Sequence, residues 1–214
     1  MRDRIERYWH DLCAVAAAMP YAALGRVADT LLECNERGNT VFVLGNGGSA
    51  STASHFACDL AKGTRTPGRP AFRVIPLTDN VPMITAWGND TSYDRVFAEQ
   101  LSALVRPHDV VLVISASGNS PNIVAAIEVA RESRAITIAL TGESGGRVAP
   151  MSDIAVRVPL IPIEQVEDAH SIITHSLCVA LRERLRDEAV DVLVAPVFAN
   201  GSAGASATSM VDGE

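Results

Sequence analysis

Residues 41–59, VFVLGNGGSASTASHFACD, decide the fold of this chain. The first four residues are continuously apolar, which is typical of a strand buried on both faces. The glycine turn Gly45–Gly48 follows, and glycine suits a backbone with positive φ or a ligand that approaches closely. Ser49, Ser51 and Thr52 are candidates to cap a helix whose free N–H groups favour an oxyanion such as phosphate. GNGG matches neither the dinucleotide motif GxGxxG nor the P-loop.

The same pattern recurs at residues 109–120, DVVLVISASGNS. A buried strand is expected at Val110–Ile114, then a polar glycine turn, and then a helix that begins near Pro121. Further strands are expected at residues 72–75, 135–140 and 154–158. Since helices alternate with these strands, the sequence predicts an α/β fold, a three-layer α-β-α sandwich around a doubly wound, five-stranded parallel sheet. Ligands of such sheets bind beyond the carboxyl ends of the strands, where both turns fall.

The helices divide the chain into three parts. Residues 1–37 form two helices around Pro20, and the first carries an apolar stripe with Tyr8 and Trp9 that must pack on the body or on another subunit. Residues 38–187 form the main domain, and residues 188–214 a tail that is expected to be flexible, although 192–198 is apolar enough for a strand or a docking segment. Within the main domain, helices are expected at 81–87, ended by Gly88-Asn89-Asp90, at 93–105 and at 163–184.

The composition narrows the function classes. The chain has 214 residues, of which 48% are hydrophobic and 20% charged, so it can bury a core. A net charge of −7 argues against nucleic acid or a membrane surface as partner. Four scattered cysteines lack zinc-ribbon spacing and are expected to be reduced thiols. We find no apolar leader and no run of about 20 apolar residues, and therefore expect a cytoplasmic protein.

Four segments, GNGGSASTASHFACD, WGNDTSYDRVF, VISASGNSPN and VEDAHSIITH, resemble the sugar isomerase (SIS) domain family over roughly residues 1–187. Within it the chain is most similar to the phosphoheptose isomerases, which interconvert sedoheptulose 7-phosphate and a heptose 7-phosphate. The resemblance implies an SIS fold and a homotetramer with sites at the subunit interfaces. It also implies a set of residues that contact the sugar phosphate. These are Asn46, Gly47, Gly48, Ser49, Asn89, Asp90, Ser115, Ala116, Ser117, Ser120 and Glu167.

The resemblance further implies one Zn²⁺ per subunit, bound by His55, Asp59, Glu167 and His175. Asp59 stands where the enzymes have a glutamate, and Glu167 where they have a glutamine. Glu167 and His175 are eight residues apart, or about 12 Å along a straight helix. They share one ion only if Glu167 lies in a bent entry turn or if subunits contribute separately. Asp168 and His170 are nearby alternatives.

These positions predict an aldose–ketose isomerase that works through an enediol or enediolate. By resemblance, Asp59 is the base and His175 the acid. Two alternatives are an isomerase of a different ketose phosphate and a non-catalytic SIS-domain adaptor of the kind that associates with the bacterial replication initiator. An etherase of an amino-sugar acid phosphate ranks last, because such enzymes are typically longer and their glutamates are not evident.

Overall fold

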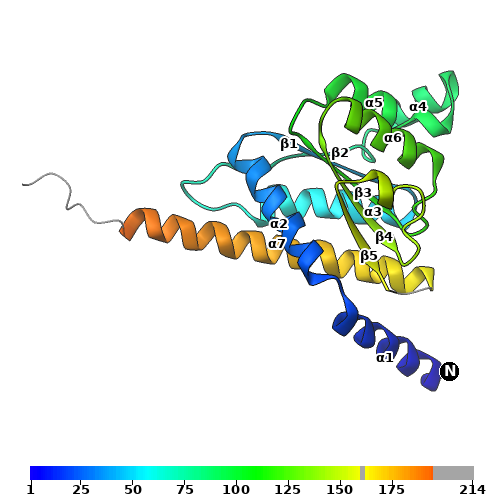
Figure 1. Ribbon diagram of the computed structural model, residues 1–214, viewed down its shortest axis with the longest axis horizontal. Helices are drawn as coiled ribbons and strands as arrows, with labels where there is room; N and C mark the ends of the chain where they lie inside the picture. The colour runs from blue at the N-terminus through cyan, green and yellow to red at the C-terminus, as the bar shows by residue number, and fades with distance from the viewer. Residues whose placement is uncertain (160–161, 195–214) are drawn as a thin grey trace, which may run out of the picture.

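A computed structural model describes residues 1–159 and 162–194, and five parallel strands lie at its centre (Figure 1). The strand order β2-β1-β3-β4-β5 is that of a doubly wound sheet with its switch point between β1 and β3. This confirms the predicted fold class. The strands are β1 (Thr40–Gly45), β2 (Arg73–Pro76), β3 (Val110–Ser115), β4 (Ile136–Gly142) and β5 (Ile154–Val158). The helices are α1 (Arg2–Ala18), α2 (Tyr21–Glu36), α3 (Gly48–Cys58), α4 (Val81–Asp90), α5 (Ala98–Leu104), α6 (Pro121–Glu132) and α7 (Ile163–Val194), with single turns η1 (Asp59–Gly63), η2 (Tyr93–Arg95) and η3 (Ala149–Met151).

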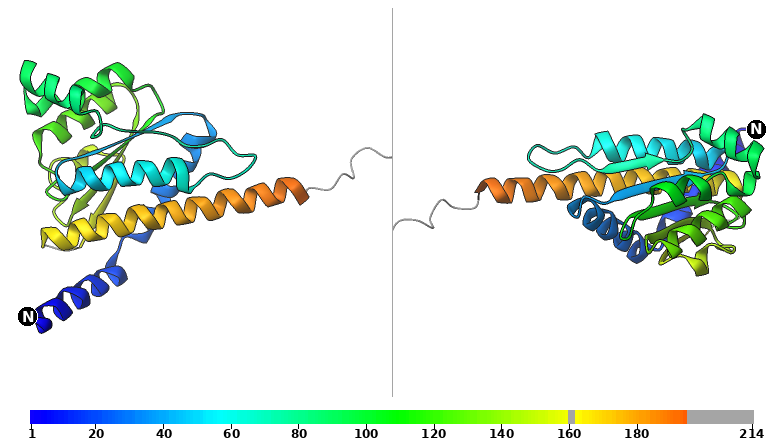
Figure 2. Two further views of the ribbon diagram at one scale, coloured as in Figure 1. Left: turned by 180° about the vertical axis from the view of Figure 1, so that it is seen from behind. Right: turned by 90° about the horizontal axis from the view of Figure 1, so that it is seen from above.

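The sheet separates two apolar cores, because successive side chains of a strand point to opposite faces. In β1, Val41 and Val43 pack toward α2, α3 and α7, whereas Phe42 and Leu44 pack toward α5 and α6. All four side chains are buried, as the apolar run predicted. Figure 2 shows the helices on both sides of the sheet.

The first helix projects from the body of the molecule (Figures 1 and 2). Of its residues only Val15 is buried, and Trp9 remains 63% exposed. Two polar contacts join it to α7: the Tyr8 hydroxyl donates to Asp168 at 2.5 Å, and Gln165 Nε2 donates to the Tyr8 carbonyl at 3.1 Å. The bond to Asp168 raises the pKa of Tyr8 to about 12. The apolar stripe of α1 is therefore largely unburied in a single chain.

Three of the expected element bounds are wrong. Residues 88–90 do not end the helix before them but form the last turn of α4. The segment 93–105 is a 3₁₀ turn followed by the short helix α5, not one helix. The helix α7 continues ten residues past the expected Arg184, so residues 188–194 are helical, and the rest of the expected tail, 195–214, lies outside the described residues.

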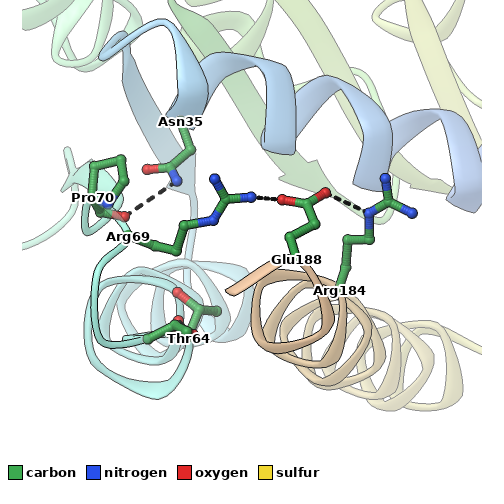
Figure 3. A network of polar contacts seen from close by, with 7 residues as sticks. Asn35, Thr64, Arg69, Pro70, Arg184 and Glu188 are labelled. Carbon is green, nitrogen blue, oxygen red and sulfur yellow. Dashed lines mark hydrogen bonds and ion pairs between the residues drawn. The ribbon is translucent and has the colours of Figure 1, made fainter. Parts of the chain in front are cut away.

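An ion pair joins the C-terminal half of α7 to the loop that follows η1. Glu188 pairs with Arg69 of that loop and with Arg184 Nε, the latter at 2.6 Å (Figure 3). Asn35 Nδ2 of α2 donates to the Pro70 carbonyl of the same loop at 3.3 Å. The loop after η1 is therefore held by α7 through an ion pair and by α2 through a hydrogen bond. No single helix in the described parts of the chain is long and apolar enough to cross a membrane; α1 and α2, bent by 73°, meet that test only as a pair.

Candidate active site

The glycine turn joins β1 directly to α3. Gly47 has φ of +54° and is the N-cap residue, and Ser49 does not cap the helix as expected but is buried in its first turn. A Cβ atom on Gly45 would lie 2.7 Å from the Ser49 carbonyl oxygen. The helix can start so close to the strand only because residue 45 is glycine. No side chain caps α3, which leaves its N-terminus open to an anion.

Asn46 belongs to this turn and is held by two residues from other elements. Its side chain forms a reciprocal amide pair with Asn122 of α6, with both N–O distances at 2.9 Å. The Tyr93 hydroxyl also donates to Asn46 Oδ1, at 3.1 Å. Asn122 is 1% exposed, so the pair ties the turn after β1 to the start of α6 across the switch point of the sheet.

The serine turn lies after β3, next to the glycine turn. Ser115 is buried and its Oγ accepts from the Gly118 N–H, while Ser117 is exposed and its Oγ accepts from the Asn119 N–H. Ser120 is the N-cap residue of α6, but its hydroxyl makes no capping bond. Two free or exposed hydroxyls and a helix N-terminus therefore face one small region, an arrangement suited to a phosphate.

The loop after β4 packs closely against the serine turn. Gly118 and Gly146 touch each other's backbones so closely that a Cβ atom on either would approach within 2.5 Å of the other turn. Asn119 links the two as well, since its Nδ2 donates to the Ser117 carbonyl and its Oδ1 accepts from the Arg147 N–H. A cavity of about 280 Å³ opens beside the turn. It is lined by Ala116, Ser117, Gly142, Glu143, Ser144, Ile163 and Val166.

A second cluster of chemically active side chains lies between α3 and α7. Asp59 Oδ2 is 3.5 Å from His55 Nε2 and 3.6 Å from His175 Nε2, and the two imidazole rings meet edge to face with centroids 5.0 Å apart. One ligand atom from each residue lies within 4.8 Å of the other two. A tetrahedral ion with bonds of about 2.1 Å has ligand atoms about 3.4 Å apart, so the three residues fit a metal ion and leave a further position for another ligand. Their exposure, partial for Asp59 and larger for the histidines, leaves this position accessible.

Because α3 and α7 pack in parallel, three contacts between α3–η1 and α7 follow one another in chain order. Glu167 lies over Gly48, Thr52 Oγ1 is 3.5 Å from Ser171 Oγ, and His175 meets Asp59. Because α7 is continuous from Ile163, Glu167 does not bend toward His175. The structure therefore brings three of the four expected metal ligands together and places Glu167 at the glycine turn instead.

The two alternative ligands are not part of this cluster. Asp168 accepts the bond from Tyr8 described above. His170 is fully buried, and neither ring nitrogen makes a hydrogen bond of normal geometry within the described chain. Burial lowers the pKa of His170 to about 4, against a weaker opposing effect of the Thr141 backbone. His170 is therefore a neutral core residue.

Asn89 and Asp90 lie at the exposed end of α4, where Asn89 Nδ2 donates to Asp90 Oδ1 at 2.8 Å. Tyr93, three residues later, is the residue of this segment that reaches the glycine turn. Tyr93, Asn119 and Asn122 lie within segments that carry the family resemblance, but the sequence patterns predicted no role for them. The glycine-rich turn after β4 contributes Glu143 and Ser144 to the cavity wall.

Comparisons with known proteins identify the family of this chain. Residues 7–142 match the SIS domain family. The phosphoheptose isomerase of Trichlorobacter lovleyi is 38% identical over 164 residues, which cover 77% of this chain and 83% of the relative. Two solved structures superpose with a TM-score of 0.79: a phosphoheptose isomerase from Francisella tularensis, at 37% identity over 85% of this chain and 97% of its own, and one from Neisseria gonorrhoeae, at 30% identity over 85% and 98%. The chain belongs to the SIS domain family, among the phosphoheptose isomerases.

Proposed function

We propose that this chain is an aldose–ketose isomerase that interconverts sedoheptulose 7-phosphate and D-glycero-D-manno-heptose 7-phosphate. The observation that supports this proposal most directly is the pairing of a carboxylate with an imidazole, Asp59 with His175, at 3.6 Å. The same chain has an uncapped helix N-terminus at Ser120 that suits an anion. Isomerisation requires one group that moves a proton between adjacent carbons and another that exchanges protons with the sugar oxygens. The two side chains supply one group of each kind.

The proton transfers follow from these roles. Asp59 accepts the proton from C1 of the ketose, which leaves an enediolate, and returns it to C2. His175 donates a proton to the oxygen on C2 and accepts the proton of the C1 hydroxyl, so the sum of atoms is unchanged. The hydroxyls of Ser115, Ser117 and Ser120, with the backbone at Ala116, hold the phosphate. Asn46, the backbone of Gly47 to Ser49, Asn89, Asp90 and Glu167 contact the sugar.

Zn²⁺ is the metal we propose for the cluster of His55, Asp59 and His175. Two imidazoles and a carboxylate are ligands that zinc accepts, and the spacing of their atoms suits a tetrahedral ion. When bound, the ion would polarise the carbonyl oxygen and stabilise negative charge on the enediolate. Glu167 would complete the set only from another subunit, since within one chain it lies two turns of α7 away.

A homotetramer with sites shared between subunits is part of the same proposal. Along α3, Gly48 and Asp59 are separated by about 16 Å, more than the length of an extended heptose phosphate. A partner chain that brings its own cluster to this turn would shorten that distance. Large apolar side chains are exposed on α1 and α7, and we infer that subunits bury them: Ile5, Trp9, Ile172 and Val179. We expect Trp9→Glu to reduce the molar mass measured by light scattering and to reduce activity with it.

The direct test is the reaction itself. Purified protein with sedoheptulose 7-phosphate, with Zn²⁺ or with chelator, is followed by NMR of the sugar. We expect turnover that is lost in Asp59→Asn and His175→Ala. A chain that binds the sugar phosphate without turnover under any condition is a non-catalytic adaptor or acts on a different ketose phosphate, and the proposal fails.

A further inference from the structure

The amide pair of Asn46 and Asn122 determines what Asn46 can offer to a substrate. An amide oxygen has two lone pairs, and an amide nitrogen has two N–H donors. Asn46 Oδ1 already accepts from Asn122 Nδ2 at 2.9 Å and from the Tyr93 hydroxyl at 3.1 Å, so its acceptor capacity is filled. Its Nδ2 uses one N–H to reach Asn122 Oδ1. The one group that remains free on this side chain is an N–H donor.

Tyr93 supplies the asymmetry in this arrangement. Two asparagines that exchange hydrogen bonds are equally satisfied if both amides turn over together, because donor and acceptor then change places on both sides. The donation from Tyr93 to Asn46 Oδ1 favours one of the two orientations, because a phenolic hydroxyl is a stronger donor than acceptor. Asn122 keeps the pair in place, since it is 1% exposed and lies in the first turn of α6. The two residues come from separate elements and converge on one side chain.

The fixed donor lies where the chemistry needs one. Asn46 follows the carboxyl end of β1 and precedes the open N-terminus of α3, at the switch point of the sheet. In an isomerisation, negative charge develops on the sugar oxygens, and a preorganised donor stabilises the transition state more than the ground state. An amide free to turn over would present its oxygen part of the time, and that oxygen would repel the developing charge.

We infer that Tyr93 and Asn122 are positioning residues that hold Asn46 as a hydrogen-bond donor to an oxygen of the sugar. This inference rests on the proposed isomerase function. It concerns the polarity of one contact, which the bond from Tyr93 favours, and not the identity of the phosphate site. Tyr93 acts from an exposed position, so its hydroxyl can be removed without opening a cavity in the core.

Steady-state kinetics of Tyr93→Phe with sedoheptulose 7-phosphate test the inference. We expect kcat to fall about tenfold with KM within about twofold, because the lost interaction matters most in the transition state. Inhibition by inorganic phosphate, which reports the serine turn, should be unchanged. The matched control is Tyr21→Phe, in which the removed hydroxyl is similarly exposed and donates to the Ala16 carbonyl at 2.6 Å. Its kinetics should equal those of the unmodified chain.

A second variant examines the buried partner. Asn122→Ala should reduce kcat at least as much as Tyr93→Phe, and the double variant should add little, because both act through Asn46. If Asn122→Ala folds poorly, Tyr93→Phe alone decides. Unchanged kcat in Tyr93→Phe, a raised KM at constant kcat, or an equal loss in Tyr21→Phe would each overturn the inference. Absence of turnover in the unmodified chain would instead contradict the proposed function, so the two failures are distinguishable.

Discussion

The carboxylate of Glu167 lies directly over Gly48: a Cβ atom at position 48 would be 2.8 Å from Glu167 Oε2. An acidic side chain thus occupies the entrance of the helix whose N-terminus is open to anions. The helix N-terminus favours this negative charge, and a bound sugar can displace or share it. Glu167, which the resemblance places where the family has a glutamine, therefore lies at the glycine turn and not at the cluster of His55, Asp59 and His175 in the same chain.

Gly48→Ala tests this contact without disturbing the fold. The atom it would strike is the end of a flexible side chain, so Glu167 moves aside at little cost in stability. We expect a melting temperature within about 2 °C of the original and a kcat/KM that falls about tenfold. The control is Gly25→Ala in α2, where a Cβ atom meets no heavy atom within 4 Å. It should leave kcat/KM unchanged, and equal kinetics in Gly48→Ala would contradict the assigned role.

Gly45→Ala, in contrast to Gly48→Ala, should reduce the stability of the fold. Its Cβ atom would lie 2.7 Å from the backbone oxygen of Ser49, so strand β1 and helix α3 would have to separate. We expect a loss of about 2–3 kcal/mol in the free energy of unfolding, measured by urea denaturation. A loss below about 1 kcal/mol would show that the turn adapts more easily than the glycine contact implies.

Metal binding can be measured without turnover. A ligand that binds only the folded state stabilises it, by about 2.7 kcal/mol when its concentration is 100 times its Kd. We therefore expect Zn²⁺ to raise the melting temperature of the chelator-treated protein, and expect this rise to shrink in His55→Ala and Asp59→Asn. His10→Ala removes an exposed histidine of α1 that is outside the cluster and should respond as the original does. Equal responses in all four proteins would argue against the site.

Local sequence patterns predicted most of the fold. All five expected strands form, and β1, β3 and β4 are buried along nearly their whole length, as their apolar runs predicted, whereas the edge strand β2 is partly exposed. The pattern was less informative where tertiary contacts decide. Gly88 looked like a helix terminator, yet α4 runs through it, and the bonds among Asn46, Asn122 and Tyr93 join residues up to 76 positions apart. Spacing along one helix also could not show that Glu167 faces Gly48, because that depends on how α3 and α7 pack side by side.

His170 makes stability depend on pH. Its pKa is about 4 in the folded chain, below the ordinary value of 6.5, so the unfolded chain binds a proton first as the pH falls. The folded state therefore loses stability between about pH 6.5 and pH 4, by roughly 2 kcal/mol at pH 5 and roughly 3 kcal/mol below pH 4. We expect His170→Leu to remove this part of the slope when unfolding free energy is measured at several pH values. His170→Gln is a second reference, and parallel slopes in all three proteins would contradict the assignment.

Glu188 should contribute to stability through its position between Arg69 and Arg184 (Figure 3). The pair with Arg69 is the stronger of the two, since both of its side chains are mostly buried whereas Arg184 is 66% exposed. Glu188→Gln leaves the Arg69 charge partly buried without its counterion, and we expect a loss of about 1–2 kcal/mol in the free energy of unfolding. Glu183→Gln, an exposed position on the same helix, should change it by less than about 0.5 kcal/mol. In a double-mutant cycle with Arg69→Met, a coupling near zero would mean that the loop after η1 is held by Asn35 and by packing alone.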